Sequence, residues 1–262
     1  MSRSVAIVTG AASGIGRATA ELLAGREYQV IGVDIDAGGL EQTAAAGGGR
    51  TIVACAADIG TEQGARSAVA AAVEKGGPDL LVNVAGIAVA GDRVDRISLD
   101  EWERVQRVNV TSIFLMSRFA IPEMRQRGRG VIVNVASVHA YATMPGNAAY
   151  AASKGAVVAL TRAMALDHAA DGIRVVAVAP GCVDTPMSRR SADFAGVSSL
   201  EDLGFSFDPN AAGRVAGPEE IAEAIYWLGS DRASFINGTT LMADGALTAA
   251  LGPTRQQVAE RA

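Results

Sequence analysis

The sequence is poor in the features that mark several classes of protein. Its Lys and Arg residues form no block and the formal net charge is −5, so the basic footprint of a nucleic-acid-binding protein is absent. No uninterrupted apolar run approaches the ~18 residues that a membrane helix needs, and the run near the N-terminus is too short for a signal peptide. Histidine is scarce and no metal-ligand cluster is present, so no metal is expected. These absences exclude nucleic acid, membrane and metal from the expected partners.

Cysteine is scarce as well. Cys55 and Cys182 each lie beside an apolar run, which favours thiols in a reducing compartment over a disulfide. We therefore expect a cytoplasmic protein. The chain has 262 residues, of which 49% are hydrophobic, and it is long enough to bury a sizeable core.

Short apolar runs alternate with helical patterns along the chain. Seven runs predict strands, at 4–10, 28–34, 51–58, 79–86, 130–137, 173–181 and 239–245. Helical patterns occupy 16–25, 61–75, 99–126 and 150–170, and a last helix begins near Pro218. The strands are nearly all apolar instead of alternating, which is typical of parallel strands covered on both faces. The predicted fold is α/β: a single doubly wound Rossmann-type domain over 1–262 with a parallel, seven-stranded sheet.

One long segment, 184–217, is predicted to be irregular. It is rich in Ser, Asp, Gly and Pro and contains Phe194, Phe205 and Phe207. It follows the carboxyl end of a strand, where folds of this kind bind ligands. We interpret it as a substrate lid, and a variable surface insertion is the alternative.

The stretch TGAASGIG, at 9–16, joins the first strand to the first helix. Gly10 permits a sharp turn, and Gly14 and Gly16 leave room for a pyrophosphate at the helix N-terminus, where free N–H groups and the dipole favour anions. A lone glycine motif is weak evidence, but this one has the strand-turn-helix context that a dinucleotide site requires. A tight structural turn is the alternative.

Asp34 ends the second predicted strand. An acid at this position accepts hydrogen bonds from the adenosine ribose and repels a 2′-phosphate, which favours NAD over NADP. Arg17, a cation inside the first helix, is the one feature that counts against a preference for NAD. A solvated acid at a strand end is the alternative.

Tyr150 and Lys154 lie four residues apart in an Ala-rich helical run, so they share one face of the helix. A nearby ammonium favours the phenolate and lowers the pKa of a tyrosine, which makes Tyr150 a candidate proton acceptor. Ser137 ends the preceding strand and is placed to hold a substrate oxygen. The alternative is a packed tyrosine beside a lysine that reaches for solvent. His139, two residues past Ser137, and Tyr141 are open between substrate contact and packing.

The chain resembles the short-chain dehydrogenase/reductase family along almost its whole length. TGAASGIG resembles the cofactor turn TGxxxGxG, and NVAG at 83–86 resembles NNAG with Val84 in place of the second Asn. YAASK at 150–154 is similar to the YxxxK active-site motif, and PGCVDTPM at 180–187 to the segment after the sixth strand. The C-terminal block also matches, although Ala246 stands where a second glycine is common. Members are usually homotetramers, which the resemblance implies here.

The resemblance implies four catalytic residues. Tyr150 would be the acid/base, Lys154 would lower its pKa and hold the nicotinamide ribose, and Ser137 would orient the substrate. Asn109 would hold a water in a proton relay to Lys154. The implied cofactor contacts include Asp58 at the adenine ring; the expected cofactor-binding set is Gly10, Ser13, Gly14, Ile15, Gly16, Asp34, Ile35, Asp58, Ile59, Asn83, Ala85, Gly86, Tyr150, Lys154, Pro180, Gly181, Val183 and Thr185.

The expected function is reversible hydride transfer between NAD(H) and a secondary alcohol or ketone. A sugar, a polyol or a small hydroxy compound fits the acidic chain and Asp34 best. One alternative is reduction of a 3-oxoacyl thioester. Another, from a different class, is a non-catalytic NAD-binding sensor or structural subunit, which would be expected to lose the Tyr/Lys pair.

Overall fold

Seven parallel strands occur where the apolar runs predict them. The computed structural model describes residues 4–26, 28–47, 52–89, 93–195, 200 and 212–249. The strands are β1 (Val5–Thr9), β2 (Gln29–Asp34), β3 (Ile52–Ala56), β4 (Leu80–Asn83), β5 (Gly130–Val135), β6 (Ile173–Pro180) and β7 (Thr240–Ala243). They form one sheet in the order β3-β2-β1-β4-β5-β6-β7, and each neighbouring pair is parallel. The predicted Rossmann-type α/β fold is confirmed.

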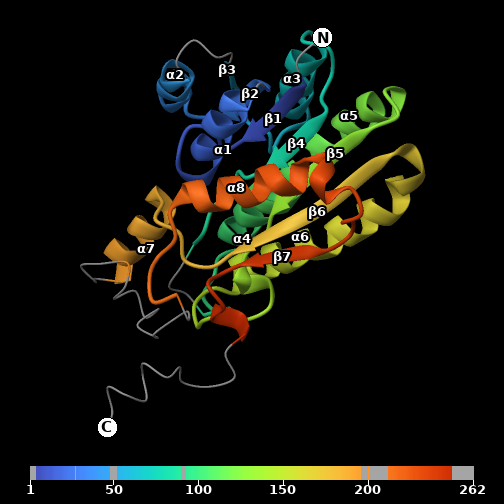
Figure 1. The fold of residues 1–262 in the computed structure, drawn as a ribbon. Helices are drawn as coiled ribbons and strands as arrows, with labels where there is room; N and C mark the ends of the chain where they lie inside the picture. Colours follow the sequence, from blue (N-terminus) through green and yellow to red (C-terminus); the bar gives the residue numbers. More distant parts are fainter. Residues whose placement is uncertain are drawn as a thin grey trace.

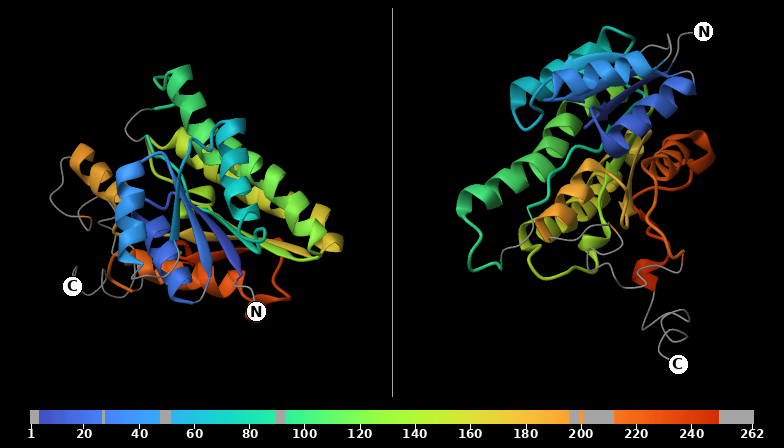
Figure 2. Two further views of the ribbon diagram at one scale, coloured as in Figure 1. Left: turned by 90° about the horizontal axis from the view of Figure 1, so that it is seen from above. Right: turned by 90° about the vertical axis from the view of Figure 1, so that its left-hand side faces the viewer.

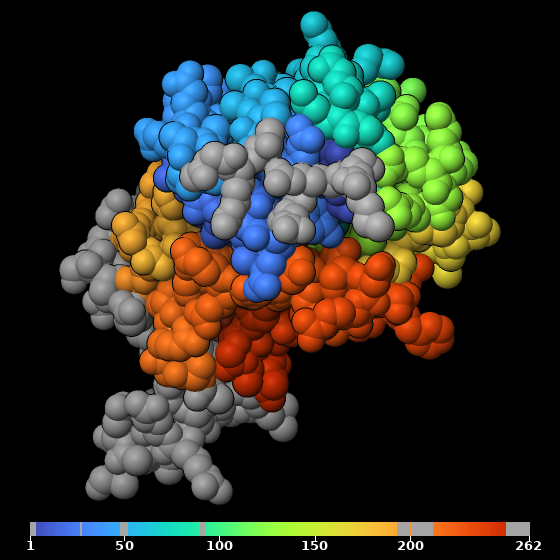
Figure 3. Space-filling model, turned by 45° about the horizontal axis from the view of Figure 1, so that its top comes forward, coloured from blue at the N-terminus to red at the C-terminus, as the bar shows by residue number. Residues whose placement is uncertain are grey.

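Helices cover both faces of this sheet, as Figures 1 and 2 show. One face carries α1 (Gly14–Gly25), α2 (Ala37–Ala46) and α8 (Pro218–Gly229). The other carries α3 (Glu62–Val73), α4 (Leu99–Gln106), α5 (Ser112–Gln126) and α6 (Ala148–His168). In Figure 3, α8 lies directly against α1, on the face of the sheet that also carries α2.

Two apolar cores fill the space between the sheet and its helices. Ile7, Leu81 and Ile132 point into the core beneath α3, α5 and α6. Their neighbours Val8 and Val82 point into the core beneath α1 and α8. Each such side chain contributes about 1.5–3 kcal/mol when it is fully buried. The double burial explains why apolar residues occupy most strand positions and do not alternate with polar ones.

Arg174 ties β6 to the end of α8. Its guanidinium donates hydrogen bonds to the carbonyl oxygens of Leu228 and Ser230, each at 3.0 Å, and of Ile236 at 3.1 Å. The bonds to Leu228 and Ser230 satisfy carbonyl groups that the end of α8 leaves without intrahelical partners.

Three parts of the predicted secondary structure need correction. The helix α2 is not among the helices that the sequence patterns predict. The helix expected over 99–126 is interrupted by a π turn, Arg107–Thr111, between α4 and α5. The segment 184–217 is not irregular throughout, because Pro186–Ala195 form the helix α7. Residues 196–199 and 201–211, including Phe205 and Phe207, lie outside the described residues, as does the side chain of Phe194. The lid therefore stays a prediction.

The two cysteines do not form a disulfide with each other. No helix in the described part of the chain is long and apolar enough to cross a bilayer.

Candidate active site

A cleft of about 730 Å³ opens at the carboxyl ends of the strands. This volume lies within the ~300–1,000 Å³ usual for small-molecule sites. Every residue predicted to bind the cofactor or to act in catalysis lines it, apart from Asn83 and Asn109. The parallel sheet explains this convergence, because it brings the carboxyl end of every strand to one edge.

The glycine turn enters the cleft between β1 and α1. Gly10 and Gly14 have positive φ angles of 69° and 52°, which side chains rarely adopt. A Cβ atom on Gly16 would overlap the carbonyl oxygen of Gly10, so helix and strand can meet here only without a side chain. Ser13, the N-cap of α1, makes no side-chain cap bond, which leaves N–H groups of the first turn for a ligand. The turn fits a pyrophosphate group.

Asp34 stands at the end of β2 beside this turn. Its carboxylate accepts hydrogen bonds from the backbone N–H groups of Ala12 and Asp36, both at 3.1 Å. These two bonds fix the carboxylate on the wall of the cleft. Arg17 is committed elsewhere: its guanidinium donates to the carbonyl oxygen of Ala12 at 2.7 Å and to the Thr43 hydroxyl at 3.1 Å.

Asp58, which follows β3, also lines the cleft. One carboxylate oxygen accepts the N–H of Gly60 at 2.9 Å, and the other lies 3.4 Å from the Arg107 guanidinium. This pair is exposed, so its contribution to stability is small. Arg107 therefore borders the predicted adenine position, which sequence reasoning did not indicate.

Ser137, Tyr150 and Lys154 meet at the opposite end of the cleft. Ser137 follows β5, and the other two share one face of α6. The Lys154 ammonium lies 5.6 Å from the centre of the Tyr150 ring and donates a hydrogen bond to the Val135 carbonyl oxygen at 2.8 Å. The Ser137 hydroxyl oxygen accepts the backbone N–H of His139 at 3.2 Å, and the hydroxyl also hydrogen-bonds Tyr150.

Burial dominates the ionisation of this group. It raises the pKa of the Tyr150 phenol above its usual range, and hydrogen bonding to Ser137 offsets this only in part. It also lowers the pKa of the Lys154 ammonium to about 8. Desolvation therefore dominates the ionisation of Tyr150 in this structure, and the lowering of its pKa by Lys154 stays a prediction. Tyr150 is protonated at neutral pH, the state needed to give a proton to a ketone oxygen.

Asn109 lies in the π turn and is fully buried. Its side-chain oxygen accepts the Ile87 N–H at 2.8 Å, and its amide donates to the Ile87 carbonyl at 2.9 Å and to the Ser153 hydroxyl at 3.0 Å. A Cβ atom on Gly86 would lie 3.3 Å from the Asn109 oxygen and 3.5 Å from the Lys154 nitrogen. The Asn109 side chain therefore lies near the Lys154 ammonium. The proton relay through a bound water stays a prediction.

Asn83 requires a correction. Its side chain does not line the cofactor side of the cleft: it is 2% exposed and donates a hydrogen bond to the Asn134 oxygen at 2.8 Å, between β4 and β5. Thr9 holds the loop that follows instead. Its hydroxyl accepts the N–H groups of Val84 and Ala85, at 3.0 and 3.1 Å. Sequence reasoning missed Thr9, although it belongs to the quoted glycine motif.

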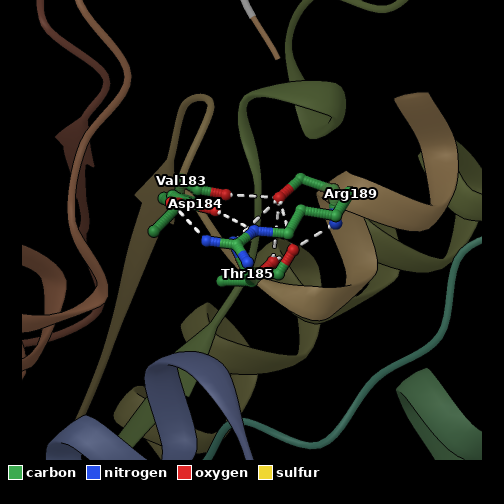
Figure 4. Close-up of polar contacts among 5 residues, drawn as sticks. Val183, Asp184, Thr185 and Arg189 are labelled. Carbon is green, nitrogen blue, oxygen red and sulfur yellow. Dashed lines mark hydrogen bonds and ion pairs between the residues drawn. The ribbon is translucent and has the colours of Figure 1, made fainter. Parts of the chain in front are cut away.

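The start of α7 forms the wall beside the glycine turn. Figure 4 shows the hydrogen bonds that fix it: the Ser188 hydroxyl donates to the Val183 carbonyl at 2.6 Å, and the Thr185 N–H donates to the Ser188 oxygen at 2.9 Å. Arg189 pairs with Asp184 through two contacts, at 2.6 and 2.8 Å. A Cβ atom on Gly14 would lie 3.2 Å from the Thr185 side chain, so α7 begins directly over the glycine turn.

Replacement of Lys154 by Met should remove a pH dependence of stability. The folded protein loses the Lys154 proton near pH 8 and the unfolded chain near pH 10.5, so the unfolded chain binds more protons between these values. The free energy of unfolding of the wild type should therefore rise across this window by up to about 3 kcal/mol more than that of the variant.

Urea unfolding at pH 7.5 and pH 10 measures this difference. Lys75→Met is the matched control, because Lys75 is the other lysine and is exposed. A wild-type-minus-variant difference that is the same at both pH values would contradict the prediction.

The fold and this cleft define an oxidoreductase that binds a nicotinamide dinucleotide, and comparison with known proteins gives its family. A family model described as enoyl-(acyl carrier protein) reductase matches residues 10–248. The chain belongs to the short-chain dehydrogenase/reductase family, and the relatives named as dehydrogenases act on CH–OH groups.

Three similar proteins illustrate the family. The 2-(R)-hydroxypropyl-CoM dehydrogenase of Xanthobacter autotrophicus is 38% identical, over 95% of this chain and 100% of its own. The 2,5-dichloro-2,5-cyclohexadiene-1,4-diol dehydrogenase of Sphingobium indicum is 41% identical, over 95% and 98%. A structure of 3-ketoacyl-(acyl-carrier-protein) reductase from Brucella melitensis complexed with NADH is 36% identical, with a TM-score of 0.85 over 94% of this chain and 98% of its own.

Proposed function

We propose that this protein is an NAD-dependent dehydrogenase of a polyol, a sugar or another small hydroxy compound, built as one catalytic domain with a lid near 184–217. The observation that carries the proposal is the meeting of Ser137, Tyr150 and Lys154 in a cleft whose other end holds the glycine turn and Asp34. The cleft has room for a dinucleotide and a small substrate, and its polar groups stand at both ends.

The catalytic residues have different roles in the transfer of one proton. Ser137, whose oxygen already accepts the His139 N–H, donates its proton to the substrate oxygen and orients it. Tyr150 gives a proton to that oxygen in reduction and takes it back in oxidation. Lys154 stabilises the phenolate by its charge, and Asn109 steadies the loop at Ile87 in front of Lys154. The nicotinamide, when bound, supplies the hydride donor or acceptor.

The preference for NAD is inferred from Asp34 and Arg17 together. The Asp34 carboxylate is fixed at the end of β2, where it would accept ribose hydroxyl groups and repel a phosphate. Arg17, the nearby cation that tempered this inference, is held by Ala12 and Thr43. The NADH bound to the similar Brucella melitensis reductase supports the same choice.

Replacement of Asp34 by Ala should lower the ratio of kcat/KM for NAD to kcat/KM for NADP by about tenfold or more. The variant loses two charge-assisted bonds to the ribose and the repulsion of a 2′-phosphate. Initial rates with each cofactor, at one saturating alcohol, give the ratio. Asp36→Ala is a control for the neighbouring acid. An unchanged ratio in Asp34→Ala would show that Asp34 does not determine the cofactor preference.

The experiment that tests the function is NADH formation from NAD over a panel of polyols, sugars, hydroxy acids and sterols. The blank is Tyr150→Phe. A substrate oxidised by the wild type and not by this variant establishes the reaction and narrows its substrate class. Bound NAD with no oxidation across the panel would contradict the proposed substrate class.

Reduction of a 3-oxoacyl thioester is the second candidate. It is favoured by the Brucella melitensis neighbour, which is named a 3-ketoacyl-(acyl-carrier-protein) reductase. NADH oxidation in the presence of acetoacetyl-CoA tests it directly. A kcat/KM for this thioester above that for every ketone tested would favour the second candidate.

We further propose a homotetramer that works in the cytoplasm. Large apolar side chains stand exposed on α5, on α6 and after α8, namely Phe114, Leu166 and Phe235. Faces of this kind commonly mark contacts between subunits. Light scattering coupled to size exclusion measures the assembly, and a monomer at micromolar concentration would contradict it.

A further inference from the structure

His139 stands beside the catalytic tyrosine without a part in the mechanism above. It lies on the short turn Val138–Ala140 that follows Ser137, and it lines the cleft. Its ring meets the Tyr150 ring edge to face, with 5.4 Å between the ring centres and 76° between the planes. A ligand oxygen held by the Tyr150 hydroxyl therefore has the imidazole as its neighbour.

The orientation of the His139 ring is fixed from one side. Its Nδ1 atom is 2.9 Å from the Thr143 hydroxyl, and its own backbone N–H is held by Ser137. Within the described residues, Nε2 has no hydrogen-bond partner, although the ring is half-buried. Burial lowers the pKa of the imidazole, so the ring is neutral at physiological pH and Nε2 serves as an uncharged donor or acceptor.

Three other neutral polar side chains that line the cleft donate a hydrogen bond within the protein. Asn147 donates to the Pro145 carbonyl, Ser188 to Val183, and Ser191 to Met187. Arg190 also lines the cleft, from α7, but it is a cation, whereas the His139 ring is neutral. His139 is thus a neutral polar group that contacts the Tyr150 ring and whose Nε2 is available to a ligand.

We propose that His139 binds a second hydroxyl or carbonyl oxygen, on the carbon adjacent to the one that reacts, and that the substrate class is therefore vicinal diols and the matching hydroxyketones. This inference rests on the proposed dehydrogenase function and adds to it a substrate-binding residue. Ser137 and Tyr150 hold the reacting oxygen, and His139 selects substrates that bear its neighbour. A site built to bond a hydroxyl discriminates against analogues that lack it, because its polar group is then left unpaired.

Matched substrate pairs test the proposal. The pairs are 2,3-butanediol with 2-butanol, and cyclohexane-1,2-diol with cyclohexanol, each oxidised with NAD. We expect the wild type to give a kcat/KM for the diol about tenfold or more above that for the alcohol with one hydroxyl. His139→Phe keeps an aromatic ring against Tyr150 but cannot bond the hydroxyl, so this ratio should fall about tenfold. His139→Gln keeps a donor and an acceptor and should retain most of the ratio.

The two variants separate recognition from packing. If the ring only supports Tyr150, Phe will preserve activity on both members of a pair and Gln will lower both alike, which would overturn the proposal. Tyr141→Phe is the control, because Tyr141 is exposed and does not line the cleft. A wild type that oxidises the single alcohols without preferring the diols would overturn the inference and leave the dehydrogenase function standing. A wild type that oxidises neither would overturn both.

Discussion

Tyr150→Phe is expected to lower the turnover of a secondary alcohol by about 10²–10⁴-fold, the range typical of a general acid–base residue. The variant keeps the ring that packs against His139 and Lys154 and loses only the hydroxyl that carries the proton. NAD affinity should stay within about threefold of the wild type, because the glycine turn and Asp34 lie at the other end of the cleft. Steady-state rates and NAD titration by calorimetry measure the two effects.

Tyr141→Phe provides the matched control. It removes a hydroxyl from a tyrosine nine positions away in the sequence whose side chain is exposed outside the cleft. The control should keep wild-type turnover. Turnover near the wild-type value in Tyr150→Phe would remove Tyr150 from the mechanism, whereas a parallel loss of NAD binding would assign it to the cofactor site instead.

Gly16→Ala should have the largest effect of any single change at the cofactor site. The new methyl group would overlap the carbonyl oxygen of Gly10, and backbone cannot move aside as a flexible side chain can. The strain should destabilise the protein by about 3 kcal/mol and displace the turn that receives the pyrophosphate. We expect NAD affinity to fall by about 100-fold, measured by titration at a temperature where the variant is folded.

Gly38→Ala separates this clash from the general effect of adding a methyl group. Gly38 is exposed in α2, and a Cβ atom there would make only an ordinary contact, 3.6 Å from an Asp36 oxygen. The substitution should leave NAD binding intact and stabilise the helix slightly, by up to about 1 kcal/mol. Equal losses in the two variants would show that the close approach at Gly16 is not the cause.

Much of the fold follows from local sequence signals. Runs such as 79–86 and 173–181 are mostly apolar instead of alternating because their strands are covered on both faces, and this pattern indicates a parallel sheet. Pro218 and the acids after it specify the start of α8, where Glu220 bonds the N–H of Gly217 at 2.9 Å. The parallel sheet then brings Gly10, Asp34 and Ser137 to one edge.

The features that sequence reasoning missed depend on contacts between distant parts of the chain. The position of Asn83 at the end of its strand predicts a cofactor contact. Its side chain instead donates a hydrogen bond to Asn134 on the neighbouring strand. The pKa of Tyr150 depends on how deeply the cleft wall buries it, which spacing from Lys154 does not reveal. The ring contact of His139 with Tyr150 likewise appears only when the turn after β5 meets α6.

The π turn between α4 and α5 has a consequence for how this chain tolerates insertion and deletion. A π turn holds one residue more than the α-helix would place there. Deletion of a residue such as Val110 would let α4 and α5 join as one regular helix with its backbone bonds intact. It would also remove the wide turn on which Asn109 lies. Asn109 would then lose its hydrogen bonds to Ile87 and Ser153. A deletion that keeps the helix intact would therefore disturb the residues next to Lys154.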